Sequence, residues 1–178
     1  FAVRQRERAA QMLDKLIEWM RANKREFVAA ERDFRITIGR AVLSGQVDRL
    51  ELDGGGRLVV VDLKTGKTPP RTDDLPQHAQ LGAYQLAVVE GAFDDIADGV
   101  RATGGAELIQ LGSTRKTPGV QRQEPLTAGD DSWAHEMVRR CADGMAGAVF
   151  DAVDNELCRV CPVRTSCPVQ REGRQVTA

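Results

Sequence analysis

Apolar residues recur at helical spacing in the N-terminal segment, between residues 6 and 23. The opposite face of that segment carries Arg, Lys and Glu side chains. This pattern predicts an amphipathic helix that packs one face against a core. Its apolar positions are Ala9, Met12, Leu13, Leu16, Ile17 and Met20.

The following segments have the patterns of strands. Residues 26–38 become rich in β-branched and aromatic side chains, Gly39-Arg40 indicates a turn, and residues 41–52 predict a second strand paired to the first. After a Gly-rich turn, residues 58–63 form a nearly continuous apolar run. Such a run is typical of a strand buried on both faces, so we expect residues 58–63 to be the central strand of a sheet.

The second half of the chain predicts further helices and strands. Residues 65–76 hold three of the seven prolines and indicate a loop. A helix is expected from about 77 to 90, a strand over 106–111, and a loop or weak strand over 112–125. Asp130 or Asp131 could cap another helix that runs to about Phe150. The order of elements predicts an α/β fold, a mixed central sheet flanked by helices.

Length and composition agree with one domain that has its own core, since the chain has 178 residues, of which 42% are hydrophobic. We expect residues 1–150 to form the core and residues 151–178 a Cys-rich C-terminal part of the same domain. The chain begins at Phe1 within a charged helical pattern, so we expect a fragment of a longer protein. With neither a membrane-spanning run nor a signal-peptide pattern, the cytoplasm is the expected location.

The formal net charge is −1, so the chain lacks the overall basic field of many nucleic-acid-binding proteins. Any contact with DNA must then be local. Arg49 beside the first candidate aspartate could face a scissile phosphate, and basic residues in predicted loops could position DNA without reading its sequence. Ordinary solvated side chains are the alternative for the loop residues, which are Arg71, Arg115, Lys116 and Arg122.

Two aspartates and a lysine carry the candidate chemistry. If residues 41–52 and 58–63 pair antiparallel, Asp48 and Asp62 approach each other near the end of the sheet, and two carboxylates there can hold Mg²⁺ or Mn²⁺. The period of a strand puts Asp62 and Lys64 on one face. A metal would polarise a phosphate and activate water, while Lys64 could orient that water or neutralise developing charge. The alternative is that Asp48 and Asp62 cap turns and that Lys64 is a solvated residue at the end of a strand. That alternative does not explain why a charged residue directly follows three valines.

These residues belong to a larger pattern. The segments Gly45-x-x-Asp48-Arg49, Val61-Asp62-Leu63-Lys64-Thr65-Gly66 and Gln80-Leu81-x-x-Tyr84 stand in an order and spacing that resembles the successive motifs of the RecB-like PD-(D/E)xK nucleases. The resemblance runs from about Phe27 to Cys167. It implies a restriction-endonuclease-like fold and a Mg²⁺- or Mn²⁺-dependent deoxyribonuclease, an exonuclease.

The resemblance also implies a role for each matching residue. Asp48 and Asp62 would bind the metal, with the main-chain carbonyl of Leu63 as a further ligand, and Lys64 would be the catalytic lysine. Glu31, expected just before the first strand, is similar to the family's upstream acidic residue, which helps to hold or orient the metal; a surface glutamate is the alternative. Some relatives use a histidine for this role, and this sequence has none near Glu31.

Gln80 and Tyr84 are four residues apart, so on a helix they share a face. The resemblance places both beside the active site and the DNA. The alternative is that Tyr84 packs in the core with Leu81 and Leu86 while Gln80 is exposed.

Three of the four cysteines, Cys158, Cys161 and Cys167, fall within ten residues beside prolines. A close Cys-x2-Cys pair is typical of zinc and iron-sulfur sites, both of which need a fourth ligand. The resemblance favours a 4Fe-4S cluster that fastens the C-terminal tail to the fold, with its fourth cysteine upstream. That ligand could lie outside this chain, or Cys141 could replace it, although Cys141 is expected on the buried stripe of the last helix. Free thiols are the remaining alternative.

The combined interpretation is the nuclease module of a helicase-nuclease that processes double-strand breaks for recombination. Thr65-Gly66-Lys67-Thr68 resembles the end of a phosphate-binding loop, but Val61 stands where that motif needs glycine, so a motor would be another domain or subunit. Three alternatives are open: a stand-alone exonuclease of the type associated with CRISPR adaptation, a non-catalytic DNA-binding or scaffolding module, and a zinc-binding transcription module. The last would not explain the acidic strand.

Overall fold

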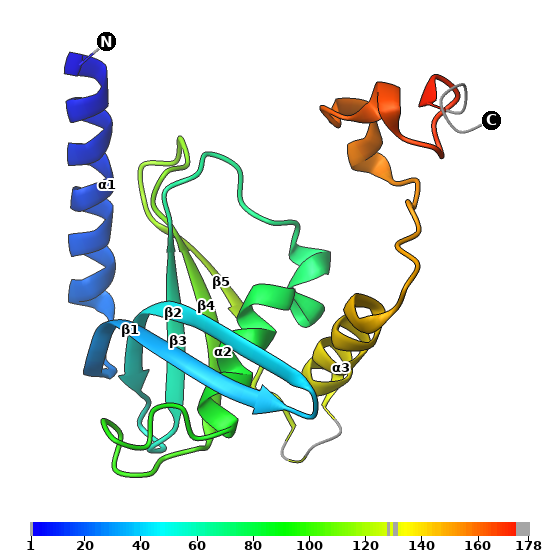
Figure 1. Cartoon of the computed structure of the whole chain (residues 1–178). Coiled ribbons are helices and arrows are strands. Elements are labelled where there is room, and N and C mark those ends of the chain that lie inside the picture. Colours follow the sequence, from blue (N-terminus) through cyan, green and yellow to red (C-terminus); the bar gives the residue numbers. More distant parts are fainter. Residues whose placement is uncertain (1, 128, 130–131, 174–178) are drawn as a thin grey trace. The chain divides into compact units, whose positions relative to one another are not determined.

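The computed structural model describes residues 2–127, 129 and 132–173 (Figure 1). The chain divides into two compact units, Phe1–Arg140 and Cys141–Ala178. The last long helix, α3 (Trp133–Ala146), begins in the first unit and ends in the second.

The first unit is built on a five-stranded sheet in the order β1-β2-β3-β4-β5. Neighbouring strands are antiparallel except β3 and β4, which run parallel. A parallel pair needs a crossover, and the chain makes it through α2 (Ala79–Val89). The predicted central strand is confirmed, because β3 has two strands on either side. The strands are β1 (Glu26–Ile38), β2 (Ala41–Leu52), β3 (Leu58–Lys64), β4 (Thr103–Gln110) and β5 (Gly119–Gln123).

Helices cover both faces of the sheet, as the alternation of side chains along β3 requires. Leu58 and Val60 lie in one core cluster with residues of α2. Val59 and Val61 point to the opposite face and pack against Trp19 of α1 (Ala2–Ala22). The fold is therefore the α/β, restriction-endonuclease-like arrangement that the sequence predicts (Figure 1).

Several boundaries differ from the sequence prediction. The segment expected to be a loop over 65–76 ends in a 3-10 helix, η1 (Thr72–Gln77), before α2 begins. The weak strand within 112–125 is β5, the outer partner of β4. The helix expected to reach Phe150 ends at Ala146. The predicted caps Asp130 and Asp131 lie outside the described residues.

One charged residue, Lys15, lies where its chemistry alone would not put it. Lys15, on the charged face of the predicted helix, is only 6% exposed. Its ammonium group donates hydrogen bonds to the carbonyl oxygens of Leu111 at 2.9 Å and Ser113 at 2.7 Å. Those carbonyls follow β4, so Lys15 joins α1 to the end of the sheet.

In the second unit, two short 3-10 helices, η2 (Glu156–Val160) and η3 (Arg164–Ser166), interrupt an otherwise irregular segment. The Asn155 side chain accepts a hydrogen bond from the Leu157 amide at 2.9 Å and so begins η2. Across the described part of the chain, no helix is both long and apolar enough to span a membrane.

Candidate active site

Asp62 lies near the end of β3 and is only 2% exposed. It has the same parity as Leu58 and Val60, so its side chain emerges on the α2 face of the sheet. Lys64 follows on that face, and its ammonium nitrogen lies 2.8 Å from Asp62 Oδ2. The period of the strand thus brings this acid and this lysine into contact.

Asp48 approaches the same place from β2. Its Oδ2 accepts a hydrogen bond from the Leu63 amide at 2.7 Å, which connects the end of β2 to the residue between Asp62 and Lys64. Burial raises the pKa of Asp62. The nearby Lys64 lowers the pKa of Asp62, the charge of Asp48 raises it, and His78 lowers it. Burial is the largest of these influences, so the net pKa is raised.

Gln80 connects the aspartate, the lysine and a tyrosine. Its side-chain oxygen accepts from Lys64 Nζ at 2.8 Å, and its amide nitrogen donates to Asp62 Oδ1 at 3.0 Å and to the Tyr84 hydroxyl at 2.8 Å. Tyr84 is half-buried and packs edge-on against Phe34, with ring centroids 6.0 Å apart. Burial is the main cause that raises the pKa of Tyr84, so the phenol keeps its proton.

Glu31 lies inside β1 rather than before it, which corrects the expected position. The paired residues Ala30–Arg49 and Arg32–Val47 flank it, so Glu31 is directly across from Asp48 on the neighbouring strand. Its backbone has φ of 49°, unusual for a residue other than glycine. The Glu31 side chain is exposed.

The carboxylates can accommodate a divalent cation. Asp62 Oδ2 is buried and has no hydrogen bond of good geometry, although Lys64 Nζ lies beside it. Such an oxygen is suited to a cation, and Mg²⁺ keeps several waters and needs only one or two carboxylates from the protein. No group of three or more His, Cys, Asp or Glu side chains surrounds a common point within the described residues. Asp48 and Asp62 are the carboxylates that such a cation would contact here.

Sequence reasoning overlooked His78. This residue caps the N-terminus of α2, its charge acts on Asp62, and its Nδ1 is buried without a hydrogen bond. The available signal was its position two residues before Gln80, at the start of the predicted helix.

Arg49 does not face the scissile region, contrary to expectation. Because successive strand residues alternate, Arg49 points to the face opposite Asp48. There its Nε donates to Glu51 at 2.5 Å, and its guanidinium lies 4.5 Å from the Phe27 ring centroid. Arg122 is likewise engaged with Glu107 at 2.7 Å on that face.

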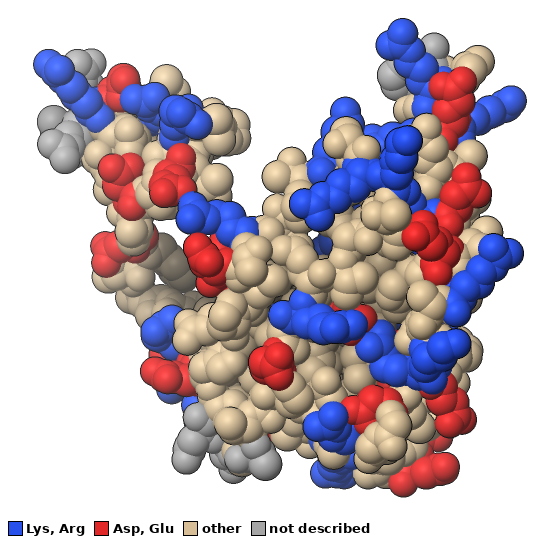
Figure 2. Space-filling model, turned by 180° about the vertical axis from the view of Figure 1, so that it is seen from behind, with Lys and Arg blue, Asp and Glu red and all other residues tan. Residues whose placement is uncertain are grey.

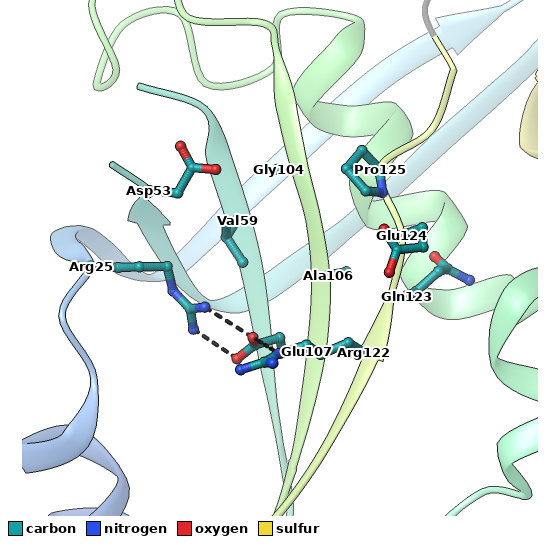
Figure 3. Close-up of a pocket in the computed structure, with 10 residues that line it drawn as sticks. All are labelled: Arg25, Asp53, Val59, Gly104, Ala106, Glu107, Arg122, Gln123, Glu124 and Pro125. Atoms are coloured by element: carbon teal, nitrogen blue, oxygen red, sulfur yellow. Dashed lines mark hydrogen bonds and ion pairs between the residues drawn. The ribbon is translucent and has the colours of Figure 1, made fainter. Parts of the chain in front are cut away.

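These arginines belong to an ion network around two buried acids, Glu51 and Glu107. Arg25 connects them, donating to Glu51 at 2.7 Å and to both oxygens of Glu107 at 2.9 and 2.7 Å. Figure 3 shows Arg25 and Arg122 converging on Glu107 beside a cavity of about 230 Å³. Because arginines neutralise both acids, we interpret this ion network as a structural feature that joins the neighbouring strands.

The tail cysteines Cys158, Cys161 and Cys167 are each partly exposed, and Cys141 on α3 is exposed rather than buried as expected. The Asn155 amide donates to Cys158 Sγ at 3.3 Å. That contact is the largest single influence and lowers the pKa of the Cys158 thiol. The hydrogen bond to the Asp154 carboxylate, burial and the nearby negative charges together outweigh it, so the net pKa is raised. The three thiols do not form an assembled ligand group within the described residues.

Comparison with known proteins gives one informative match. The model of the PD-(D/E)XK nuclease superfamily matches residues 1–168. No curated protein matches significantly. Among solved structures, the crystal structure of SSO0001 is similar with a TM-score of 0.43 and 16% sequence identity, over 80% of this chain and 60% of that chain.

Proposed function

Because the chain belongs to the PD-(D/E)XK nuclease superfamily, we propose that it is a metal-dependent nuclease that hydrolyses DNA phosphodiester bonds. One observation carries this proposal: buried Asp62, beside Asp48, is held by Lys64 and Gln80 in a connected set of polar contacts. Asp62 Oδ2 is buried and has the Lys64 ammonium group, 2.8 Å away, as its partner.

Asp48, Asp62 and the Leu63 carbonyl would hold Mg²⁺ or Mn²⁺, and Glu31, opposite Asp48, would help to orient it. When bound, the metal supplies polarisation of the phosphate and a more acidic water. The buried position of Asp62 keeps bulk water away from its carboxylate and strengthens its interaction with any cation.

Lys64 has two tasks in this proposal. Without substrate, its ammonium group neutralises Asp62 at 2.8 Å. With DNA present, the same group can turn towards the scissile phosphate and stabilise the charge that develops there. Its side chain is 32% exposed, so it can reach solvent and substrate. Gln80 positions both Asp62 and Lys64, and Tyr84 positions Gln80.

The wider setting is part of the proposal. We infer an exonuclease module of the RecB-like type that works with a helicase or motor partner in double-strand break repair. The order of the Asp48, Asp62-Leu63-Lys64 and Gln80 motifs supports that type. A 4Fe-4S cluster on Cys158, Cys161 and Cys167 would need a fourth thiolate, and the described residues do not assemble a ligand set, so we assign it no role in the reaction.

The test is cleavage of end-labelled single- and double-stranded DNA with Mn²⁺ or Mg²⁺. We expect the wild type to cleave and Asp62→Ala and Lys64→Ala to be inactive. The matched controls Asp73→Ala and Lys24→Ala remove exposed side chains and should cleave like the wild type. Absence of cleavage by folded wild-type protein that still binds DNA would contradict the proposal and favour a binding module.

A further inference from the structure

The strand β1 forms one outer edge of the sheet, with β2 as its neighbour. Figure 1 shows β1 at the front of the sheet with no strand drawn beyond it. It spans 13 residues, whereas strands are usually about five or six residues long. An outer strand presents a row of N–H and C=O groups to which another chain can pair. The free side of β1 is therefore a surface on which a further strand can form hydrogen bonds.

The hairpin between β1 and β2 shows which backbone groups face away from the sheet. Its two-residue turn, Gly39-Arg40, is closed by the pair of Ile38 and Ala41. Such a closing pair exchanges both of its backbone hydrogen bonds, and antiparallel pairs then alternate between bonded and non-bonded. The residues whose N–H and C=O groups point away from β2 are Asp33, Arg35 and Thr37. Within the described part of the chain, these groups make no backbone hydrogen bond to another segment.

This stretch of β1 is regular and unprotected. From Asp33 to Ile38 the side chains alternate strictly between exposed and buried. The regular stretch begins after Glu31, whose φ of 49° departs from strand geometry. Proteins often protect an outer strand with lysines, prolines or a bulge. Residues 33–38 contain no lysine or proline, and the register shift of β1 lies earlier, between Phe27 and Ala29.

The charges on this stretch are self-complementary. In an antiparallel pair of two such edges, outward-facing residues must lie opposite each other. If Asp33 lies opposite Arg35 of a second copy, a two-fold axis also puts Arg35 opposite Asp33 of that copy, and both pairs join opposite charges. A shift of the register by two residues in either direction puts two arginines or two aspartates opposite each other, which is unfavourable. The register with Asp33 opposite Arg35 therefore satisfies both the backbone groups and the charges.

Both charges are available for such pairs. Arg35 pairs with no acid among the described residues, and the Asp33 carboxylate accepts a hydrogen bond from the uncharged Gln46 amide at 3.1 Å. The formal net charge of the chain is −1, and Figure 2 shows acidic and basic side chains mixed over one face of the molecule. A net charge near zero favours association, so no strong field of one sign keeps two copies apart.

We propose that two copies of this chain associate through antiparallel pairing of their β1 strands, with Asp33 of each copy opposite Arg35 of the other. One sheet then continues through both copies. The regular part of the contact supplies about four backbone hydrogen bonds and the two ion pairs. Because this contact is small, the association is reversible and depends on protein concentration. The proposal concerns a surface outside the candidate active site and does not rest on the proposed nuclease function.

Sedimentation velocity over a wide range of protein concentrations tests the proposal, in EDTA and with a reducing agent that keeps the cysteines free. We expect the average mass to rise with concentration from that of one chain toward that of two. Asp33→Arg and Arg35→Asp should each weaken association at least about tenfold, because each puts like charges opposite each other in both pairs. An equimolar mixture of these two variants should associate like the wild type, since the arginines of one copy then face the aspartates of the other.

Two further variants complete the experiment. Arg35→Pro removes an N–H group that faces away from β2, which an outer strand tolerates, so this variant should stay folded by circular dichroism and remain a single chain. Arg21→Asp, the same charge reversal at an exposed position of α1, should associate like the wild type. The mass of one chain at every concentration of the wild type would overturn the proposal. Association that neither single reversal weakens, or a mixture of the two variants that does not associate, would also overturn it. Because neither DNA nor metal is present, these results are independent of whether the protein cleaves DNA.

Discussion

Gln80 donates a hydrogen bond to Asp62 across 3.0 Å, from the first turns of α2 to the end of the central strand. The same amide accepts from Lys64, so one side chain orients both members of the Asp62-x-Lys64 pair. Gln80 itself is exposed, which means that its contacts serve the site more than the core.

Gln80→Ala is expected to separate activity from stability. Loss of a residue that positions ligands typically lowers activity about 10–100-fold, whereas truncation of an exposed side chain changes the free energy of unfolding by about 0.5 kcal/mol or less. Cleavage rates and chemical unfolding of the same preparation measure the two effects. Gln5→Ala, also exposed, is the matched control. A large loss of stability with normal cleavage would show that Gln80 is structural.

Asp62→Asn should stabilise the protein at neutral pH when no metal is present. Burial raises the pKa of Asp62 above its ordinary value of 3.8, so the folded state holds this carboxyl's proton more tightly than the unfolded state does. The ionised form is therefore unfavourable once the pH exceeds the folded-state pKa, and the asparagine variant avoids that cost. Thermal unfolding in EDTA should show the gain at pH 7. The gain should vanish as the pH falls below about 3.8, where both states of the wild type are neutral; a gain that persists there would contradict the prediction.

Added Mn²⁺ should make the wild type more stable than Asp62→Asn. A cation that binds only the folded state stabilises it by an amount that grows with its concentration, about 2.7 kcal/mol at one hundred times the dissociation constant. The melting temperature of the wild type should rise with added Mn²⁺, and that of Asp62→Asn should change little. Asp73→Asn, on the exposed 3-10 helix η1, should respond like the wild type. A rise of equal size in Asp62→Asn would place the metal elsewhere.

The sheet, and the Asp62–Lys64 pair at the end of its central strand, could be predicted from the spacing of apolar and polar residues. A continuous apolar run specifies a strand buried on both faces, and a period of two puts Asp62 and Lys64 on one face. The same alternation, applied to β2, would have shown that Arg49 points away from Asp48. The prediction for Arg49 is wrong because neighbouring residues of a strand point to opposite faces, so Arg49 does not share the surroundings of Asp48.

Other features depend on contacts between distant segments, which no local pattern records. Lys15 follows the charged pattern of a surface helix face, yet it is buried because two carbonyls after β4 accept its hydrogen bonds. His78 shares the surroundings of Asp62 only because η1 and α2 return to the end of β3. The catalytic roles of Asp48, Asp62, Lys64 and Glu31 stay predictions until cleavage is measured.

Glu107→Gln should destabilise the protein at neutral pH. Burial by itself raises the pKa of Glu107, but hydrogen bonds from Arg25 and Arg122 outweigh it and hold the pKa below the ordinary value of 4.5. A depressed folded-state pKa stabilises the protein above pH 4.5, and that contribution is lost as the pH falls through the lower folded value. Removal of one member of such a buried pair costs about 3 kcal/mol. Urea unfolding should show a smaller difference from the wild type at pH 3 than at pH 7, and an equal difference at both would contradict this account.

Gly112→Ala is expected to damage both the fold and the proposed site. A Cβ at residue 112 would lie 1.9 Å from the Thr65 carbonyl oxygen and 2.4 Å from that of Gly66, and backbone cannot yield as a flexible side chain can. The Gly112 amide also donates to the Lys64 carbonyl at 3.1 Å, so relief of the clash must separate the loops that follow β3 and β4. We expect a loss of about 1–3 kcal/mol in the free energy of unfolding, together with reduced cleavage. Gly54→Ala is the control, because a Cβ there meets nothing within 4 Å. If Gly112→Ala unfolds at the same urea concentration as the wild type, the close approach of these two loops does not stabilise the end of the sheet.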